Sequence, residues 1–328
     1  MSGKPLIREQ ETDMKIAVLD DNLKVAEQLA NWDALGDEVV FFENVIAAAD
    51  CSRVLADFDV IVAMRERTRF PAALIHALPN LKLIVTTGLR NNAIDLIACV
   101  DKNVTVCGAP GDDNGSVGTA ELAWALTMAL FKRMVQEDSN MKKGLWQTVM
   151  TPTLSGRCLG LVGAGKLGQQ VARYGQAFGM DVIAWSPNLT DERAQAAGVK
   201  RVDKHALFQN ADIVCVNLVL SDKTEGIIDA ACIEAMKSTA YFVNTSRAGL
   251  VDLAALKTAL QNGKIAGAGL DVFETEPLPA DDPWRHVPNT LLTPHLGYAT
   301  TDNFNAYFPN VVAAIDAFKK GQPIRVIQ

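Results

Sequence analysis

The run Leu159-Gly160-Leu161-Val162-Gly163-Ala164-Gly165-Lys166-Leu167-Gly168 lies in the middle of the chain and joins an apolar stretch to closely spaced glycines. Its pattern predicts a strand that ends in a glycine-rich turn and opens a helix. In such a turn Gly163 permits a tight change of direction, Gly165 lets the backbone approach a pyrophosphate, and Gly168 lets the helix pack closely on its strand. The helix would present unpaired N–H groups to a phosphate. The run therefore predicts a dinucleotide site, with a plain loop as the alternative.

The composition is that of a globular protein of two domains. The chain has 328 residues, 49% of them apolar and 21% charged, which indicates neither disorder nor a fibrous architecture. A net charge of -7 and a pI near 5.2 argue against a nucleic-acid surface, which needs clustered Lys and Arg. No apolar stretch is long enough to span a bilayer. We therefore expect neither nucleic acid nor a membrane as a partner.

The start of the chain and its cysteines indicate the compartment. The polar segment from Met1 to Asp13 lacks the apolar core of a signal peptide, and it predicts a mobile extension. The 6 cysteines stand singly, without a CxxC pair or a histidine at ligand spacing. They are typical of reduced core residues, so we expect a cytoplasmic protein without a metal site.

Short β-rich runs alternate with helical stretches from Met14 onward, which predicts parallel βαβ units. The expected strands are 15–19, 39–42, 59–64, 81–86 and 104–107, and then, after the glycine run, 181–185, 213–217, 240–244, 267–272 and 289–292. Residues 116–141 predict one long helix or two abutting helices. Residues 300–320 predict a helix that packs back on the first half. The order predicts an α/β protein with two doubly wound parallel-sheet domains, the first of them discontinuous, and a cleft between the domains.

Polar residues follow the last three expected strands. Arg247 comes after the first, Asp271 lies at the end of the second with Glu276 after it, and His295 comes after the third. Ligands of open α/β sheets bind at the carboxyl ends of the strands. An arginine there can hold a carboxylate and polarise a neighbouring carbonyl, although a surface arginine that caps the next helix is the alternative. A carboxylate paired with imidazole fixes its tautomer, as a general acid requires, whereas His295 taken alone is more typical of a structural turn.

This order of glycine run, Arg, Asp, Glu and His resembles the D-isomer-specific 2-hydroxyacid dehydrogenase family. The resemblance covers nearly the whole chain from Met14 onward. Its motifs lie at 81–84, 87–88, 94–95, 163–168, 244–249, 269–277 and 292–297. It implies a flavodoxin-like substrate-binding domain, residues 14–108 plus 299–328, and an NAD(P)-binding Rossmann domain, residues 109–298.

The resemblance also implies an activity and its residues. The family interconverts a 2-oxo acid and the D-2-hydroxy acid by hydride transfer with NAD or NADP. Arg247 would bind and polarise the oxo acid, His295 would deliver the proton to the carbonyl oxygen, and Glu276 would hold His295. Asp271 would contact the nicotinamide carboxamide. The residues expected at the cofactor are Gly163, Gly165, Lys166, Leu167, Gly168, Ser186, Asn217, Thr245 and Asp271.

The chain departs from the family in the loop expected to bind the substrate carboxylate, residues 87–92. Backbone amides there, at Gly88 and Leu89, would take the carboxylate. Arg90 stands where a second glycine is often found, and it would either contact a second acidic group or face solvent. Arg65 follows the expected strand 59–64. By the resemblance it faces the cleft and would favour an acidic or polar substrate, with a solvated loop charge as the alternative.

A second departure concerns the cofactor. An acidic residue about 20 positions after the glycine loop normally binds the ribose 2′-OH, and the aligned residue here is Ser186. A 2′-phosphate is then not repelled, but residues 187–190 offer no cation to bind it. We therefore expect NAD with tolerance of NADP.

One other class of function remains open. The fold is also used by corepressor-like relatives that sense NAD(H) and bind a partner. Formate oxidation is disfavoured because enzymes of that group have glutamine where Glu276 stands. The family further implies a homodimer formed through the cofactor domain, with residues 116–141 as a contributor.

Overall fold

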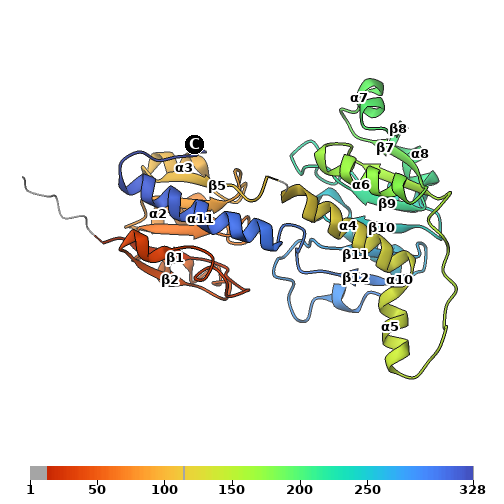
Figure 1. Ribbon diagram of the computed structural model, residues 1–328, viewed down its shortest axis with the longest axis horizontal. Helices are drawn as coiled ribbons and strands as arrows, with labels where there is room; N and C mark the ends of the chain where they lie inside the picture. Colours follow the sequence, from red (N-terminus) through yellow and green to blue (C-terminus); the bar gives the residue numbers. More distant parts are fainter. Residues whose placement is uncertain (1–12, 114, 328) are drawn as a thin grey trace, which may run out of the picture. The chain divides into compact units, whose positions relative to one another are not determined.

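The computed structural model describes residues 13–113 and 115–327 (Figure 1). The chain divides into two compact units. Unit 1 comprises Met1–Asp113 and Thr301–Gln328, and unit 2 comprises Asn114–Thr300. Apart from Asp13, the predicted N-terminal extension lies outside the described residues. Among the helices that are described, none combines the length and the apolar character needed to cross a bilayer.

Unit 1 contains a five-stranded parallel sheet in the order β2-β1-β3-β4-β5. This is the order of a flavodoxin-like sheet. β3 and β4 are buried along their whole length, as expected for strands that read as continuous apolar runs. The strands are β1 (Lys15–Val18), β2 (Glu38–Phe41), β3 (Val60–Ala63), β4 (Leu83–Thr87) and β5 (Thr105–Ala109).

Short helices and one returning helix cover the unit 1 sheet. They are α1 (Cys51–Val54), α2 (Ala72–Ala77), α3 (Leu96–Asp101), the 3-10 turn η1 (Trp32–Leu35) and α11 (Thr301–Lys319). α11 packs against β4 and β5 and buries one apolar face, which includes Phe304 and Phe308. Its last turn is anchored where Lys319 Nζ lies 2.7 Å from the Asp37 carboxylate. The predicted return helix is confirmed.

Unit 2 contains a seven-stranded parallel sheet in the order β12-β11-β10-β9-β6-β7-β8. The strands are β6 (Cys158–Val162), β7 (Asp181–Trp185), β8 (Lys200–Arg201), β9 (Ile213–Val216), β10 (Tyr241–Asn244), β11 (Gly267–Leu270) and β12 (Thr290–Leu292). The predicted strands of both units are present, with ends that differ by about two residues or fewer. β8 was not predicted, because two exposed residues carry no apolar pattern. Both units are doubly wound α/β sheets, which confirms the predicted fold class.

The helices of unit 2 include α6 (Lys166–Ala177), α7 (Asp191–Ala196), α8 (Lys204–Asn210), α9 (Ala230–Ala235) and α10 (Leu253–Gln261), with 3-10 turns η2 (Ala248–Leu250) and η3 (Pro283–His286). The predicted helical segment 116–141 forms two helices, α4 (Gly115–Phe131) and α5 (Met134–Lys142). They separate at Arg133, whose backbone is left-handed with φ of 51°. Figure 1 shows α5 and the extended segment after it projecting from the unit 2 sheet, and α5 has no buried residue.

Candidate active site

Three neighbouring strands of unit 2 bring the predicted catalytic residues to one edge. β10, β11 and β12 are parallel and adjacent, so their carboxyl ends meet at the same edge of the sheet. Arg247 follows β10, Asp271 follows β11, and His295 follows β12. Glu276 lies in the loop after β11. Parallel pairing thus gathers side chains that are far apart in the sequence.

His295 and Glu276 form a close pair. The imidazole Nδ1 lies 2.5 Å from Glu276 Oε2, and the two side chains are only 20% and 25% exposed. The other carboxylate oxygen of Glu276 accepts a hydrogen bond of 2.9 Å from the backbone N–H of Phe273. Burial acts to raise the pKa of Glu276, but the hydrogen bond and the charge of His295 outweigh it and hold the pKa below its usual range. Glu276 therefore stays ionised and occupies Nδ1, so Nε2 is the nitrogen left for proton transfer.

The loop that carries His295 is held by Asp271. The buried Asp271 carboxylate accepts hydrogen bonds from the Thr293 hydroxyl at 2.6 Å and from the N–H groups of Leu296 at 2.7 Å and Gly297 at 2.9 Å. Burial raises the pKa of Asp271, although these hydrogen bonds oppose the rise. His295 itself has a left-handed backbone, with φ of 51°, which an L residue adopts at a cost. The three bonds clamp the chain on both sides of that residue.

Arg247 sits in a turn that its own neighbours define. Asn244 Oδ1 accepts from the N–H of Ser246 at 2.9 Å, and Asn244 Nδ2 donates to the Arg247 carbonyl at 3.0 Å. The guanidinium donates to the Ser246 carbonyl at 2.8 Å. Its positive charge also acts, as the smallest of several causes, to lower the pKa of Glu276. The charges of Arg247 and His295 thus both act on the Glu276 carboxylate.

The glycine run has the geometry of a phosphate cradle. Gly163 has φ of 107°, and a Cβ there would lie 2.8 Å from the Asn217 carbonyl oxygen. A Cβ on Gly168 would lie 2.1 Å from the Gly163 carbonyl oxygen, so this glycine is required for α6 to approach the turn. A Cβ on Gly165 would meet no heavy atom within 4 Å. Because Gly165 is the N-cap of α6 and gives no side-chain cap, the open space lies at a helix N-terminus that can bind an anion.

The other residues predicted to bind the cofactor follow the same edge. Lys166 and Leu167 form the first turn of α6, and Ser186 follows β7. Asn217 directly follows β9, and its N–H donates to the Val162 carbonyl at 2.8 Å. Thr245 follows β10, and its buried hydroxyl has no hydrogen-bond partner in the part of the chain that the structure describes. A dinucleotide fits this edge, because it offers an open phosphate cradle at β6 and an unsatisfied hydroxyl at β10.

In unit 1, Arg65 is fixed across the predicted carboxylate loop. Its left-handed backbone, with φ of 50°, donates to Thr87 Oγ1 at 2.9 Å, and its Nη1 donates to the Thr87 carbonyl at 3.0 Å. Asn91 Nδ2 donates to the Arg65 carbonyl at 2.6 Å. A Cβ on Gly88 would lie 1.7 Å from Arg65 Nη1, so only glycine permits this placement.

The loop offers fewer backbone donors than predicted. The N–H of Gly88 donates to the Ala109 carbonyl at 2.5 Å, because the chain bridges to β5 there, and this N–H is therefore not available to a substrate. The side chains of Leu89 and Arg90 are exposed. No described atom accepts a hydrogen bond from the backbone N–H of either residue. These two amides are the ones left for a carboxylate.

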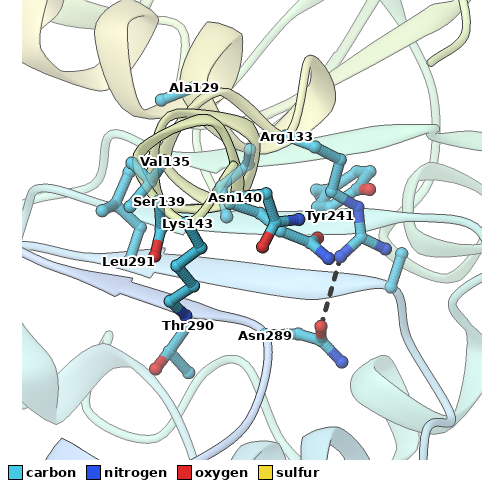
Figure 2. A pocket seen from close by; sticks show the side chains of 13 residues that line it. Ala129, Arg133, Val135, Ser139, Asn140, Lys143, Tyr241, Asn289, Thr290 and Leu291 are labelled. Atoms are coloured by element: carbon cyan, nitrogen blue, oxygen red, sulfur yellow. Dashed lines mark hydrogen bonds between the residues drawn. The ribbon is translucent and has the colours of Figure 1, made fainter. Parts of the chain in front are cut away.

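A pocket of about 400 Å³ lies elsewhere in unit 2 (Figure 2). α5 lines it together with Tyr241, which begins β10, and Asn289 and Thr290, where β12 begins. Arg133 Nη1 donates to Asn289 Oδ1 at 3.2 Å across it. The pocket is at the amino edge of the strands, opposite the edge that carries His295, so it is not part of the candidate active site.

Comparison with known proteins identifies the family. Residues 124–297 match the model of the D-isomer specific 2-hydroxyacid dehydrogenase, NAD binding domain. The chain is 34% identical over 314 residues to D-3-phosphoglycerate dehydrogenase of Archaeoglobus fulgidus, which covers 95% of this chain and 58% of that protein. It is 34% identical to glyoxylate reductase of Korarchaeum cryptofilum, over 76% of this chain and 77% of that protein.

A solved structure agrees with these matches. The crystal structure of phosphoglycerate oxidoreductase from Vibrio cholerae has a TM-score of 0.88 and 36% identity, and the match covers 94% of this chain and 99% of that one. The chain spans 58%, 51% and 52% of the length of three D-3-phosphoglycerate dehydrogenases that it matches. The chain belongs to the D-isomer specific 2-hydroxyacid dehydrogenase family.

Proposed function

We propose that the protein interconverts a 2-oxo acid and the corresponding D-2-hydroxy acid, using NAD(H) or NADP(H). The observation that carries this proposal is the 2.5 Å pair of Glu276 and His295 beside Arg247, on the sheet edge that also holds the glycine cradle. When bound, the nicotinamide supplies or accepts the hydride. The protein's own groups then bind the acid and move one proton.

Each of the three side chains has a distinct part in the proposed reaction. Arg247 binds the carboxylate of the substrate through its planar fork and polarises the neighbouring carbonyl. In reduction, protonated His295 gives the Nε2 proton to the carbonyl oxygen, and in oxidation neutral His295 takes it back. Glu276 remains ionised throughout and stabilises the imidazolium.

The substrate is not singled out by the relatives. Among them are D-3-phosphoglycerate dehydrogenase, glyoxylate reductase and hydroxypyruvate reductase. Arg65 and the N–H groups of Leu89 and Arg90 are our candidates for binding substrate oxygens. The fixed guanidinium of Arg65 supports a substrate with a polar or acidic side chain.

The proposal is tested by nicotinamide oxidation against glyoxylate, hydroxypyruvate, pyruvate, phenylpyruvate, 2-oxoglutarate and oxaloacetate. We expect His295→Ala to lower kcat by about 10²-fold to 10⁴-fold with unchanged binding of NADH, because a general acid is lost. Arg247→Ala should raise KM and lower kcat together. His205→Ala, an exposed histidine of α8, is the matched control. Full activity of His295→Ala or Arg247→Ala would refute the assignment.

The related proteins named above are dehydrogenases and reductases, so an NAD(H)-sensing binding protein is not favoured. Tight binding of NADH with no turnover of any acid in the panel would favour it instead.

We also propose a homodimer formed through unit 2. Its support is the apolar surface of α5 and the segment after it, where Met134, Met141, Leu145, Trp146 and Met150 are exposed. Exposed apolar patches of this kind are typical of interfaces. Light scattering after size exclusion should give a dimer for the parent protein and a monomer for Trp146→Glu. A monomeric parent protein would contradict the proposal.

A further inference from the structure

We propose that Arg193 binds the 2′-phosphate of NADP(H) and makes NADPH the preferred reductant. The inference rests on the cofactor site of the proposed function. It differs from the expectation of NAD with tolerance of NADP, which considered only residues 187–190 as a source of a cation. The argument starts from the loop that follows β7.

This loop is fixed beside the glycine cradle. The N–H of Gly163 donates to the Trp185 carbonyl at 2.8 Å, which ties the end of β7 directly to the glycine turn. The N–H of Leu189 donates to the Ser186 carbonyl at 3.2 Å, and the Leu189 side chain is buried. Ser186 is therefore held where an acidic residue would bind the ribose 2′-OH in an NAD-binding protein of this fold.

Arg193 lies on α7 and its side chain returns to the same loop. Its Nη1 donates to the Asn188 carbonyl at 2.7 Å, and its backbone N–H donates to the side chain of Thr190, which caps the helix, at 3.3 Å. In the described part of the chain, no carboxylate forms an ion pair with Arg193. A guanidinium has five N–H donors, so four remain for a ligand.

The two neighbouring carboxylates have partners other than Arg193. Asp191 is paired with Arg201 at 3.2 Å. A hydrogen bond from the Thr190 side chain lowers the pKa of Glu192, so this exposed carboxylate is ionised but already has a donor. Lys204, whose Nζ lies 5.9 Å from the centre of the Trp185 ring, is paired with Asp229 at 3.1 Å and is not part of the proposed site.

Ser186 and Arg193 together match the chemistry of a phosphate monoester. The hydroxyl donates one hydrogen bond, and the planar guanidinium can donate two parallel bonds to phosphate oxygens. An aspartate or glutamate at position 186 would repel the same group. The loop thus combines a donor, a cation and the absence of the carboxylate that selects NAD.

Calorimetric titration with NADPH and with NADH, without substrate, tests the inference. These two ligands differ only in the 2′-phosphate. The parent protein should bind NADPH more tightly than NADH. Arg193→Ala should lower the affinity for NADPH by about tenfold, which corresponds to the lower end of the free energy of one charged hydrogen bond, and should leave the affinity for NADH unchanged. Arg157→Ala is the matched control, because it removes the same charge next to the amino end of β6 and should change neither affinity.

A second variant keeps the test independent of Arg193. Ser186→Asp should weaken NADPH binding by about tenfold and leave NADH binding equal or tighter. Equal NADPH affinity in the parent protein and Arg193→Ala would overturn the inference, and so would tighter binding of NADH by the parent protein. With either result, binding of NADH would still support the proposed cofactor site. Failure of both dinucleotides to bind would overturn that site and this inference together.

Discussion

A single methyl group should affect mainly stability at one glycine of the cradle and mainly cofactor affinity at another. At Gly168 the added Cβ would lie 2.1 Å from the Gly163 carbonyl oxygen and 3.0 Å from its carbon. Both are backbone atoms, which cannot rotate away. Overpacking of this kind costs about 1 to 3 kcal/mol, and alanine in a helix returns about 1 kcal/mol relative to glycine. With the upper value for a backbone clash, Gly168→Ala should lose about 2 kcal/mol of unfolding free energy.

At Gly165 the added Cβ would meet no heavy atom within 4 Å, and the backbone, with φ of -75°, accepts alanine. Replacing glycine by alanine at an N-cap costs at most about 1 kcal/mol. The same methyl would fill the space above the N-terminus of α6 where the pyrophosphate must approach. Gly165→Ala should therefore lose at most about 1 kcal/mol of unfolding free energy and bind NADPH about tenfold more weakly, a loss of about 1.4 kcal/mol of binding free energy.

Thermal unfolding followed by circular dichroism, combined with a fluorescence titration of NADPH, separates the two effects. For a unit of this size, 2 kcal/mol corresponds to a fall in Tm of about 4 to 8 °C for Gly168→Ala. Wild-type affinity in Gly165→Ala would refute the assignment of the open space to the cofactor. An unchanged Tm in Gly168→Ala would refute the close packing of α6 on the turn.

Three further changes test single contacts. Folding lowers the pKa of Glu276 below 4.5, so its carboxylate adds stability at neutral pH that is lost as the pH falls through the pKa of the folded state. Urea unfolding should therefore show that Glu276→Gln is less stable than the parent protein at pH 7, with a smaller difference below pH 4.5. A difference that does not depend on pH would contradict this. Asp271→Asn should lower the free energy of unfolding by about 1 to 3 kcal/mol and speed hydrogen exchange in the loop that carries His295. Unchanged exchange would contradict the view that the Asp271 carboxylate holds this loop. Lys319→Met should lower the free energy of unfolding by about 3 kcal/mol, because it leaves Asp37 buried without its cation. Adding Asp37→Asn should recover most of this loss.

Features that depend on residues close to one another in the sequence could be predicted. The glycine run encodes its own turn, because Gly163 and Gly168 each avoid a contact with atoms close to the turn. The strands of both sheets follow from short apolar runs. The placement of Arg247 and His295 at one edge follows from parallel pairing of the strands that precede them.

Hydrogen bonds that depend on the conformation of a loop could not be predicted. Arg193 stands beyond residues 187–190, but its side chain donates to the carbonyl of Asn188, five residues earlier in the chain. Likewise, the sequence predicts that the N–H of Gly88 binds substrate, whereas in the structure this N–H donates to the Ala109 carbonyl. In both cases one hydrogen bond made by the folded loop decides which groups remain for a ligand.

The hydrogen bonds of Asp271 decide what a substitution at this residue can test. The family resemblance assigns it to the nicotinamide end of the cofactor, while its carboxylate accepts three hydrogen bonds from the loop around His295. Because that loop holds His295 in a left-handed conformation, we expect loss of the carboxylate to release the proposed proton-transfer group as well. If the proposed roles are correct, a variant at Asp271 should alter cofactor binding and proton transfer together. Glu276→Gln leaves the three hydrogen bonds of Asp271 in place, so it tests the partner of the imidazole apart from the loop that carries His295.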